Sequence, residues 1–485
     1  MNVKSISRTV GLILLITGAF QIFPLLIAVI DREPKNILAY VESLCLILLV
    51  GGALVLFSRG GNRMFSAQEG FAATGLSWIF MSAFGALPFF LSGQIPSYVD
   101  AFFEMVSGFT TTGASILTDV EALSRCNLFW RSFSHWLGGM GVLVFLLAVV
   151  PGARKNGGTG IYLMRAESPG PSVDKLTPHL RQTAMILYGI YILLTVLCIV
   201  CLLLGGMPVF DSFCIAFGTA GTGGFAIKNS SMGGYSYFLQ TVVTVFMFLF
   251  GVNFSLYYML LLRKFKAVFK NEELRLYFGI AAGSIVLIAI NISRMYNTVY
   301  EAVHHAAFQV VSIMTTTGYG TVDFEQWPAF SKAILLSLMF IGASAGSTGG
   351  GLKVSRVLLL MKSIRRTIRK ALHPRRVQPV YMDGRAVSEE VCDNVNAYLA
   401  IYCVILVLSF AIISVDGFSI GTNFSAVASC FNNIGPGFEL VGATQNFSIY
   451  SDLSKIILSL DMLLGRLEIF PLLLLLSPDT WSRRR

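Results

Sequence analysis

Long apolar runs alternate with short polar segments along the whole chain, and this alternation predicts helices of membrane-spanning length. Two runs, at residues 9–30 and 37–57, are each long enough to cross a bilayer, which takes about 20 residues. Four similar units follow, and in each of them two long runs flank a shorter one. We expect the flanking helices near 70–92 and 130–151, 183–206 and 236–262, 276–293 and 330–362, and 395–415 and 453–476.

The short run in the middle of each unit is too brief to cross the bilayer. These runs lie at 100–111, 209–220, 299–316 and 422–433. Non-helical backbone at membrane depth persists only where protein or a water-filled cavity covers it. We therefore expect four half-helices, each followed by a strand that leaves on the side where the half-helix entered.

The predicted fold is an all-α polytopic membrane protein. Four helix–pore-loop–helix repeats surround a pseudo-fourfold axis, and two extra transmembrane helices precede them. We expect the two-helix segment to span 1–66 and the four repeats to span 67–160, 161–270, 271–385 and 386–485.

Composition and charge agree with this fold. The chain is 55% hydrophobic and 13% charged, with a mean hydropathy of +0.70, which excludes an ordinary soluble domain. The net charge of +10 does not indicate a nucleic-acid partner, because most Lys and Arg residues lie at the two ends and in alternate loops. Such basic loops remain cytoplasmic. We expect a multi-pass protein of the inner membrane with both termini in the cytoplasm.

A Thr- and Gly-rich string follows each half-helix. The third, Thr315-Thr316-Thr317-Gly318-Tyr319-Gly320, allows an extended backbone with its carbonyls turned to one side, since glycine tolerates positive φ. Rings of such carbonyls replace the hydration shell of a potassium ion in selectivity filters. The first copy is Thr110–Ala114, and looser copies are Thr222–Phe225 and Asn433–Gly437.

The residues before each string also repeat. Phe103, Phe213 and Phe308 precede Gly113, Gly223 and Gly318 by ten positions, and Ser107, Ser312 and Ser429 precede Gly113, Gly318 and Gly435 by six. Because the string recurs four times, each time between a half-helix and a long apolar run, we do not attribute it to chance turns. The predicted potassium-binding positions are Thr111, Thr112, Gly113, Thr222, Gly223, Thr316, Thr317, Gly318, Asn433, Ile434 and Gly435.

Acidic residues near the half-helices either attract cations to the mouth of this filter or are ordinary solvated loop charges. They are Asp100, Glu104, Asp119, Glu121, Asp211, Glu301, Asp323, Glu325 and Glu439. Of the five histidines, we expect the adjacent His304 and His305 to be interfacial and solvated.

A glycine-rich stretch interrupts the apolar run 330–362. Gly346, Ser347, Thr348, Gly349, Gly350, Gly351 and Lys353 follow one another where a helix interior disfavours glycine. The stretch is not a Walker A loop, because Leu352 stands where the lysine is required. It is either a close-packing site between helices or, as we favour, a flexible intramembrane loop that blocks the path below the filter.

Arg466 lies near the centre of the last predicted membrane helix. A guanidinium there costs about 2.5–3.5 kcal/mol, so the side chain should face the interior of the protein. It forms either a structural ion pair with Glu468 or Asp461 or a fixed positive charge that hinders a passing cation.

These strings, with Gly346–Gly351 and Gly465–Phe470, resemble the Trk/Ktr/HKT potassium transporters over essentially the whole chain, and most closely the membrane subunit of the bacterial Trk system. The resemblance implies that the glycine-rich loop is a gate and that Arg466 lies at the pore constriction. It also implies a homodimer and a cytosolic, nucleotide-binding ring of TrkA-type subunits. For the basic residues of 353–376, the open alternatives are binding of anionic lipid headgroups and docking of that partner.

The leading functional hypothesis is channel-like potassium uptake driven by the membrane potential. The alternative is a potassium symporter coupled to protons or sodium, with Asp461 and Glu468 as candidate carboxylates on the path. No Ser/His/Asp arrangement, P-loop or Rossmann fingerprint is present in the sequence. We therefore expect no enzyme activity and no cofactor, with potassium as the substrate.

Overall fold

The computed structural model describes residues 3–58, 67–141, 180–373 and 378–478. Within these residues the fold is helical, apart from one antiparallel hairpin of β1 (Val380–Met382) and β2 (Arg385–Val387). Six of the described helices are long and apolar enough to cross a membrane, and a bent pair of helices makes a seventh candidate. This confirms the predicted all-α membrane fold.

The described α-helices fall into an N-terminal pair and four successive repeats. The pair is α1 (Val3–Ile30) and α2 (Pro34–Phe57). The first repeat holds α3 (Ala67–Gly85), α4 (Leu87–Leu91), α5 (Tyr98–Phe109) and α6 (Arg125–Gly139), and the second holds α9 (Leu180–Leu204), α10 (Val209–Gly221), α11 (Tyr237–Phe250), α12 (Phe254–Leu261) and α13 (Phe265–Lys270). The third holds α14 (Glu272–Ile292), α15 (Val299–Met314), α16 (Ala329–Ile341) and α17 (Val354–Leu372), and the fourth holds α18 (Glu389–Ile413), α19 (Ile420–Phe431), α20 (Asp452–Arg466) and α21 (Phe470–Leu476).

The helices α5, α10, α15 and α19 are the four short middle segments expected from the sequence. Hydroxyl groups cap the N-termini of three of them: Ser97, Thr298 and Ser419 accept hydrogen bonds from the backbone amides of Asp100, Glu301 and Thr422. The fourth, α10, begins after Pro208. The four helices have 12, 13, 16 and 12 residues, too few to span the bilayer.

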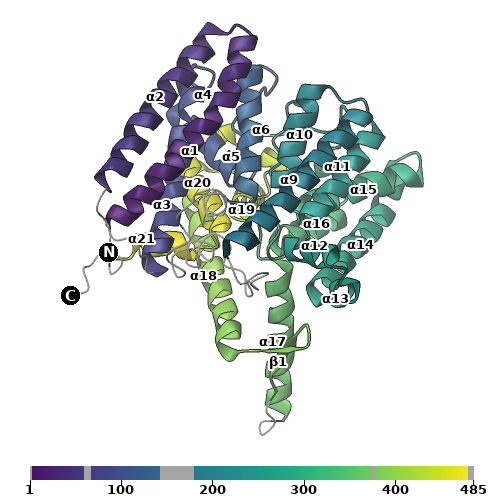
Figure 1. The fold of residues 1–485 in the computed structure, drawn as a ribbon. Coiled ribbons are helices and arrows are strands. Elements are labelled where there is room, and N and C mark those ends of the chain that lie inside the picture. The colour runs from purple at the N-terminus through teal and green to yellow at the C-terminus, as the bar shows by residue number, and fades with distance from the viewer. Residues whose placement is uncertain (1–2, 59–66, 142–179, 374–377, 479–485) are drawn as a thin grey trace, which may run out of the picture.

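The repeats pack in a closed ring. In each repeat the helix that follows the short one contacts the short helix of the next repeat: α6 packs against α10, α11 against α15, and α16 against α19. The fourth repeat closes the ring, because α20 contacts α5 of the first repeat. The N-terminal pair lies outside this ring, with α1 against α3 and α6 (Figure 1).

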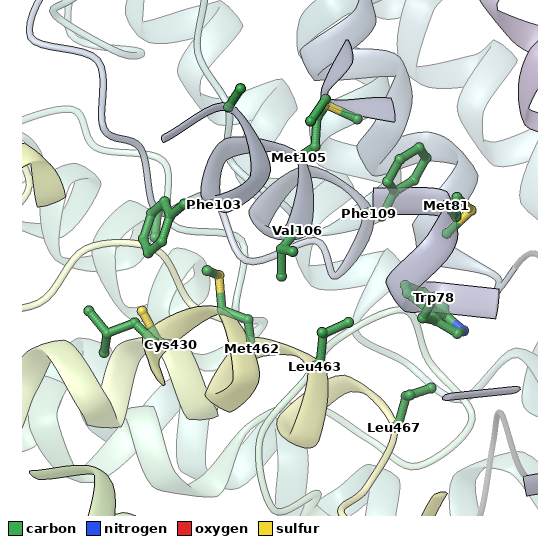
Figure 2. Packing of buried hydrophobic residues seen from close by; sticks show 14 of the residues in the cluster. Trp78, Met81, Phe103, Met105, Val106, Phe109, Cys430, Met462, Leu463 and Leu467 are labelled. Carbon is green, nitrogen blue, oxygen red and sulfur yellow. The ribbon is translucent and has the colours of Figure 1, made fainter. Parts of the chain in front are cut away.

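The contact between α5 and α20, which closes the ring, is a hydrophobic core. Figure 2 shows Phe103 and Val106 of α5 on the side of Met462 and Leu463 of α20, whereas Phe109 points away from α20. All five side chains are essentially inaccessible to solvent. Segments more than three hundred residues apart in sequence are therefore joined by the same apolar packing that stabilises a soluble core.

The predicted helices at 236–262 and 453–476 are each broken in the structure. The run 236–262 is split into α11 and α12, which are bent by 90°. The break follows Gly251, and the side chain of Asn253 caps α12 by accepting a hydrogen bond from the amide of Ser255. The carbonyls of Phe250 and Gly251, freed by the break, accept hydrogen bonds from Thr348 and Ser344 of the glycine-rich stretch. A neighbouring segment thus satisfies the exposed backbone groups, as membrane depth requires.

The run 453–476 is also broken, so the expectation that Arg466 lies mid-helix was wrong. Arg466 is the last residue of α20, and α21 begins at Phe470. Between them, Glu468 and Ile469 have φ values of 54° and 70°. Such a conformation is costly for a β-branched residue, about 1–3 kcal/mol, and is found mainly at functional sites.

A helical arm extends beyond the other helices. In Figure 1, α17, the hairpin and the start of α18 lie below the remaining helices. Contacts of α17 with β1, α18 and α14 hold the arm together and attach it to the third repeat. The predicted end of the first repeat at residue 160, and the predicted helix beyond residue 141, lie outside the described residues.

Candidate functional site

Four residues with left-handed backbone conformation mark the ends of the short helices. Thr111, Thr222, Thr316 and Asn433 have φ values of 56°, 55°, 60° and 56°. A threonine rarely adopts this conformation. Its appearance at the same point of all four repeats shows that surrounding contacts hold the backbone there, and each chain turns from its helix into an extended segment at this point.

A shared hydrogen bond fixes the register of the four segments. The amides of Thr112, Gly223, Thr317 and Ile434 donate to the carbonyls of Ser107, Gly218, Ser312 and Ser429 at 2.8–3.0 Å. This register corrects one alignment made from the sequence, in which Gly223 was equivalent to Gly113. The structural equivalent is Gly224, whose φ is 72°. The spacing from Phe213 pointed to Gly223. The serine spacing could not correct this alignment, because α10 carries Gly218 where the other three helices carry serine.

The four segments approach one another closely around a ring. A Cβ atom added to Gly113 would lie closer than 3.0 Å to the carbonyl oxygen of Gly223 in the next repeat. The same holds for Gly224 with Thr317, for Gly318 with Ile434, and for Gly435 with Thr112. All four glycines also have positive φ. Only glycine fits these positions, and the peptide groups of the residues before them follow one another in a closed circle.

Side-chain hydrogen bonds hold the backbone of these segments in place. Asn433 Nδ2 donates to Thr112 Oγ1 at 2.9 Å and to the carbonyl of Met462 at 2.8 Å, which ties the fourth segment to the first. Ser312 Oγ and Ser429 Oγ donate to the carbonyls of Tyr319 and Gly435 at 2.6 and 2.7 Å. The described contacts therefore fix the predicted positions in the first, third and fourth segments.

The second segment is held by a residue that the sequence did not single out. His135 Nδ1 lies 2.7 Å from the carbonyl oxygen of Gly108, and its Nε2 accepts a hydrogen bond from the amide of Phe225 at 3.2 Å. The imidazole is fully buried and connects the half-helix of the first repeat with the segment of the second. One histidine in an apolar run carries no sequence signal for this role.

Glu104 and Asp100, two of the acidic residues near the half-helices, form ion pairs within the protein. Glu104 is fully buried and forms an ion pair with Arg131 at 2.7 Å, while its second oxygen accepts from the amide of Ile116. Asp100 pairs with Lys455 at 2.5 Å. By contrast, Glu439 is exposed, and hydrogen bonds from Ser419 and Thr422 hold the pKa of its carboxyl below the usual range.

The Glu104–Arg131 pair gives a stability prediction. Glu104→Ala leaves the Arg131 guanidinium buried without its charge partner, which costs about 3–5 kcal/mol. We expect a large drop in the thermal unfolding midpoint of the detergent-solubilised protein. The matched control is Asp31→Ala, which removes the partner of the exposed Arg125 and costs less than about 1 kcal/mol. Equal shifts in the two variants would contradict the prediction.

The glycine-rich stretch is a loop between α16 and α17 that lies against the ends of two short helices. Gly350 N donates to Thr316 Oγ1 at 2.7 Å, and a Cβ added to Gly350 would lie 2.5 Å from the carbonyl oxygen of Asn432. Gly349 is similarly close to the carbonyl oxygen of Thr315. The loop is therefore in direct contact with the residues that end α15 and α19, and its glycines permit this approach.

Arg466 joins this loop to the opposite side of the ring. Its guanidinium donates to the carbonyl oxygen of Thr348 at 2.7 Å and to those of Gly138 and Gly139 at 2.5 and 2.6 Å. Gly465 allows the approach, since it packs directly against the carbonyl of Phe431, the last residue of α19. Lys353 Nζ donates to the carbonyl of Gly349. Two cationic groups and the loop thus meet at the inner ends of the short helices.

The two acids suggested as partners of Arg466 have other partners. Glu468 pairs with Arg356 of α17, and both side chains are buried. Asp461 Oδ1 accepts a hydrogen bond from Ser409 at 2.7 Å. The break before α21 explains the difference, because it turns Glu468 toward α17.

The remaining basic residues divide between paired and exposed positions. Lys362 pairs with Glu272 of α14, and Arg366 with Glu389 of α18 at 3.7 Å. Arg365, Arg369 and Lys370 line the arm, whereas Arg375 and Arg376 lie outside the described residues. His304 and His305 were expected to be solvated, but they are buried, where they contact Gln240 and Thr321.

Within the described part of the chain, no group of three or more His, Cys, Asp or Glu residues is arranged to hold a metal ion. The atoms gathered at the ring are instead backbone carbonyls and threonine hydroxyls.

Comparisons with known proteins identify relatives of the whole chain. A family model described as TrkH, cation transport protein, matches residues 36–483. The chain is 36% identical to the Trk system potassium uptake protein TrkH of Salmonella typhimurium, over 99% of this chain and 100% of that protein. It is 30% identical to the potassium uptake protein TrkI of Halomonas elongata, over 99% and 97%. The crystal structure of the potassium transporter TrkH from Vibrio parahaemolyticus is similar, with a TM-score of 0.88, 33% identity, and coverage of 99% of this chain and 100% of that one.

Proposed function

The chain belongs to the TrkH family of cation transport proteins, and on this premise we propose that it takes up potassium through a filter of backbone carbonyls. It is a membrane transporter rather than an enzyme. The single observation that carries the proposal is the closed circle of glycine-to-carbonyl contacts joining Gly113, Gly224, Gly318 and Gly435 to the next repeat. A circle of carbonyls fixed in this way suits an ion that has lost its water shell.

The proposed potassium ligands are the eleven filter positions predicted from the sequence. The carbonyls of Thr112, Gly223, Thr317 and Ile434 are supported best, because they occupy one equivalent position in the four repeats. The segments are unequal, with Gly-Tyr-Gly only in the third. We expect potassium to be preferred over sodium less sharply than in a filter built from four identical strands.

The proposed gate is the loop from Gly346 to Lys353 together with Arg466. Contacts of Gly349 and Gly350 with the ends of α15 and α19 support this assignment, as does the bridge that Arg466 makes across to Gly138 and Gly139. An ion that left the filter along the axis of the ring would meet this loop. The membrane potential is the proposed driving force, worth about 2.3 kcal/mol per charge per 100 mV.

We further propose a homodimer in the bacterial inner membrane, with both termini cytoplasmic, that is regulated by a cytosolic TrkA-type ring. The arm supports a docking role. Ile364, Ile368 and Leu372 on α17 are each more than half exposed, and Arg365 and Arg369 lie among them. A surface that is both apolar and basic fits a protein partner on the cytoplasmic side.

The test is rubidium uptake into liposomes that hold only this protein, under an imposed voltage and without a proton or sodium gradient. We expect uptake that potassium blocks and sodium blocks much less. An Arg466→Ala sample is run alongside, so that a closed gate does not hide the filter. Uptake equally sensitive to sodium would contradict a potassium filter.

The symporter alternative rests on Asp461. This carboxylate is buried in α20, and its Oδ2 has no hydrogen-bond partner among the described residues. Glu468 is less suited, because it is paired with Arg356. Uptake that requires a proton or sodium gradient, and that Asp461→Asn abolishes, would favour the alternative.

A further inference from the structure

Glu273 is a buried acid at the start of α14 that contacts the glycine-rich loop at two points. Only 4% of the residue is exposed. Its Oε1 accepts a hydrogen bond from the amide of Ala345 at 2.7 Å and another from the amide of Ser355 at 3.2 Å. These amides flank the proposed gate of Gly346 to Lys353: Ala345 directly precedes it, and Ser355 lies in the first turn of α17.

One carboxylate oxygen of α14 therefore holds the backbone on both sides of the loop. Hydrogen bonds to an ionised acceptor are about twice as strong as those between neutral groups. If the loop moved away, the carboxylate would lose these donors in a buried site, which is costly. The contact thus favours the loop position in which Gly349 and Gly350 lie against the ends of α15 and α19.

We propose that Glu273 is the latch of this loop, a positioning residue that keeps it in the closed position. The inference rests on the proposed function, in which the loop is the gate. It adds the residue that sets the resting position of the loop, and Glu273 itself need not touch the transported ion.

The start of α14 also holds the helical arm that is formed by α17, the hairpin and the start of α18. Glu272 pairs with Lys362 of α17, and its amide donates to Asp383 Oδ1 in the hairpin turn at 2.8 Å. Asn271 Nδ2 donates to Asp383 Oδ2 at 2.8 Å, and Asn271 Oδ1 caps α14 by accepting a hydrogen bond from the amide of Leu274. A displacement of the arm would act on the residues next to the latch, so the start of α14 couples the arm to the loop.

The experiment measures loop position and transport separately. A thiol reporter, Ser347→Cys, is placed on the loop, and its rate of modification is read by site-resolved mass spectrometry. In the Glu273→Ala background we expect the modification rate and the rubidium uptake each to rise about fivefold, because the loop loses both hydrogen bonds. Glu273→Gln keeps an acceptor without the charge and should give intermediate values. Glu390→Ala removes an exposed acid from the first turn of α18 and is the matched control.

Each outcome decides a different point. A faster modification rate with raised uptake, restored part of the way by Gln, supports the latch and the gate. Faster modification with unchanged uptake supports the latch but overturns the role of the loop as the gate. An unchanged modification rate in correctly folded Glu273→Ala, as judged by size-exclusion chromatography, overturns the latch whatever the uptake.

Discussion

Replacement of Arg466 by alanine is expected to raise rubidium uptake about a hundredfold while leaving the preference for potassium over sodium unchanged. A fixed charge about 6 Å from a passing cation raises its energy by about 3 kcal/mol at an effective dielectric constant of about 20. The three carbonyl contacts of Arg466 also bridge Thr348 of the loop to Gly138 and Gly139, so the variant removes both the proposed charge barrier and these hydrogen bonds. Uptake into liposomes under fixed voltage is the measurement.

Arg466→Lys separates these two effects. The lysine keeps the charge, but a single ammonium cannot reproduce the fork of contacts made by the guanidinium. The Coulomb estimate assigns most of the effect to the charge, so we expect uptake by Arg466→Lys to stay within about fivefold of the parent. Unchanged or lower uptake by correctly folded Arg466→Ala would show that Arg466 is not part of the barrier.

Gly113→Ser is expected to lower the preference for potassium over sodium by about thirtyfold. Its Cβ would lie closer than 3.0 Å to the carbonyl oxygen of Gly223, so the second segment must shift. A shift of a few tenths of an ångström would change the spacing of the carbonyls in the proposed filter, where such carbonyls replace the hydration shell of the ion. The measurement is the concentration of potassium, and then of sodium, that halves rubidium uptake.

Gly206→Ser is the matched control for this variant. The φ of Gly206 is 82°, against 81° for Gly113, but no atom lies within 4 Å of a Cβ added to Gly206. The control therefore carries the same backbone strain without the contact in the ring. A similar loss of selectivity in both variants would assign the effect to general destabilisation rather than to the proposed filter.

The short helices and the segments after them could be predicted from the sequence, because their signals are local. An apolar run too brief to span the bilayer, followed by threonine and glycine, is visible wherever it recurs. The second repeat shows the limit of this approach. Its Gly223-Gly224 pair offers two registers, and only the hydrogen bond of the Gly223 amide to Gly218 and the φ of Gly224 distinguish them.

Partnerships between distant residues could not be predicted. Arg131 with Glu104, Arg356 with Glu468, and Glu273 with the loop all join segments whose approach depends on how the helices pack. The breaks after Gly251 and Arg466 were missed for a related reason. An apolar run looks continuous in sequence, whereas its break is stabilised by groups from another repeat, such as the Thr348 amide that donates to Phe250.

The contact between α5 and α20 has a consequence for the biogenesis of the protein. The core in Figure 2 and the ion pair of Asp100 with Lys455 join the first repeat to the last one to leave the ribosome. Contacts of such long sequence separation form late. We therefore expect the apolar face of α5 to remain in contact with lipid until α20 has been synthesised. A chain truncated before α20 would lack the contacts with α5 that close the ring between the first and the last repeat.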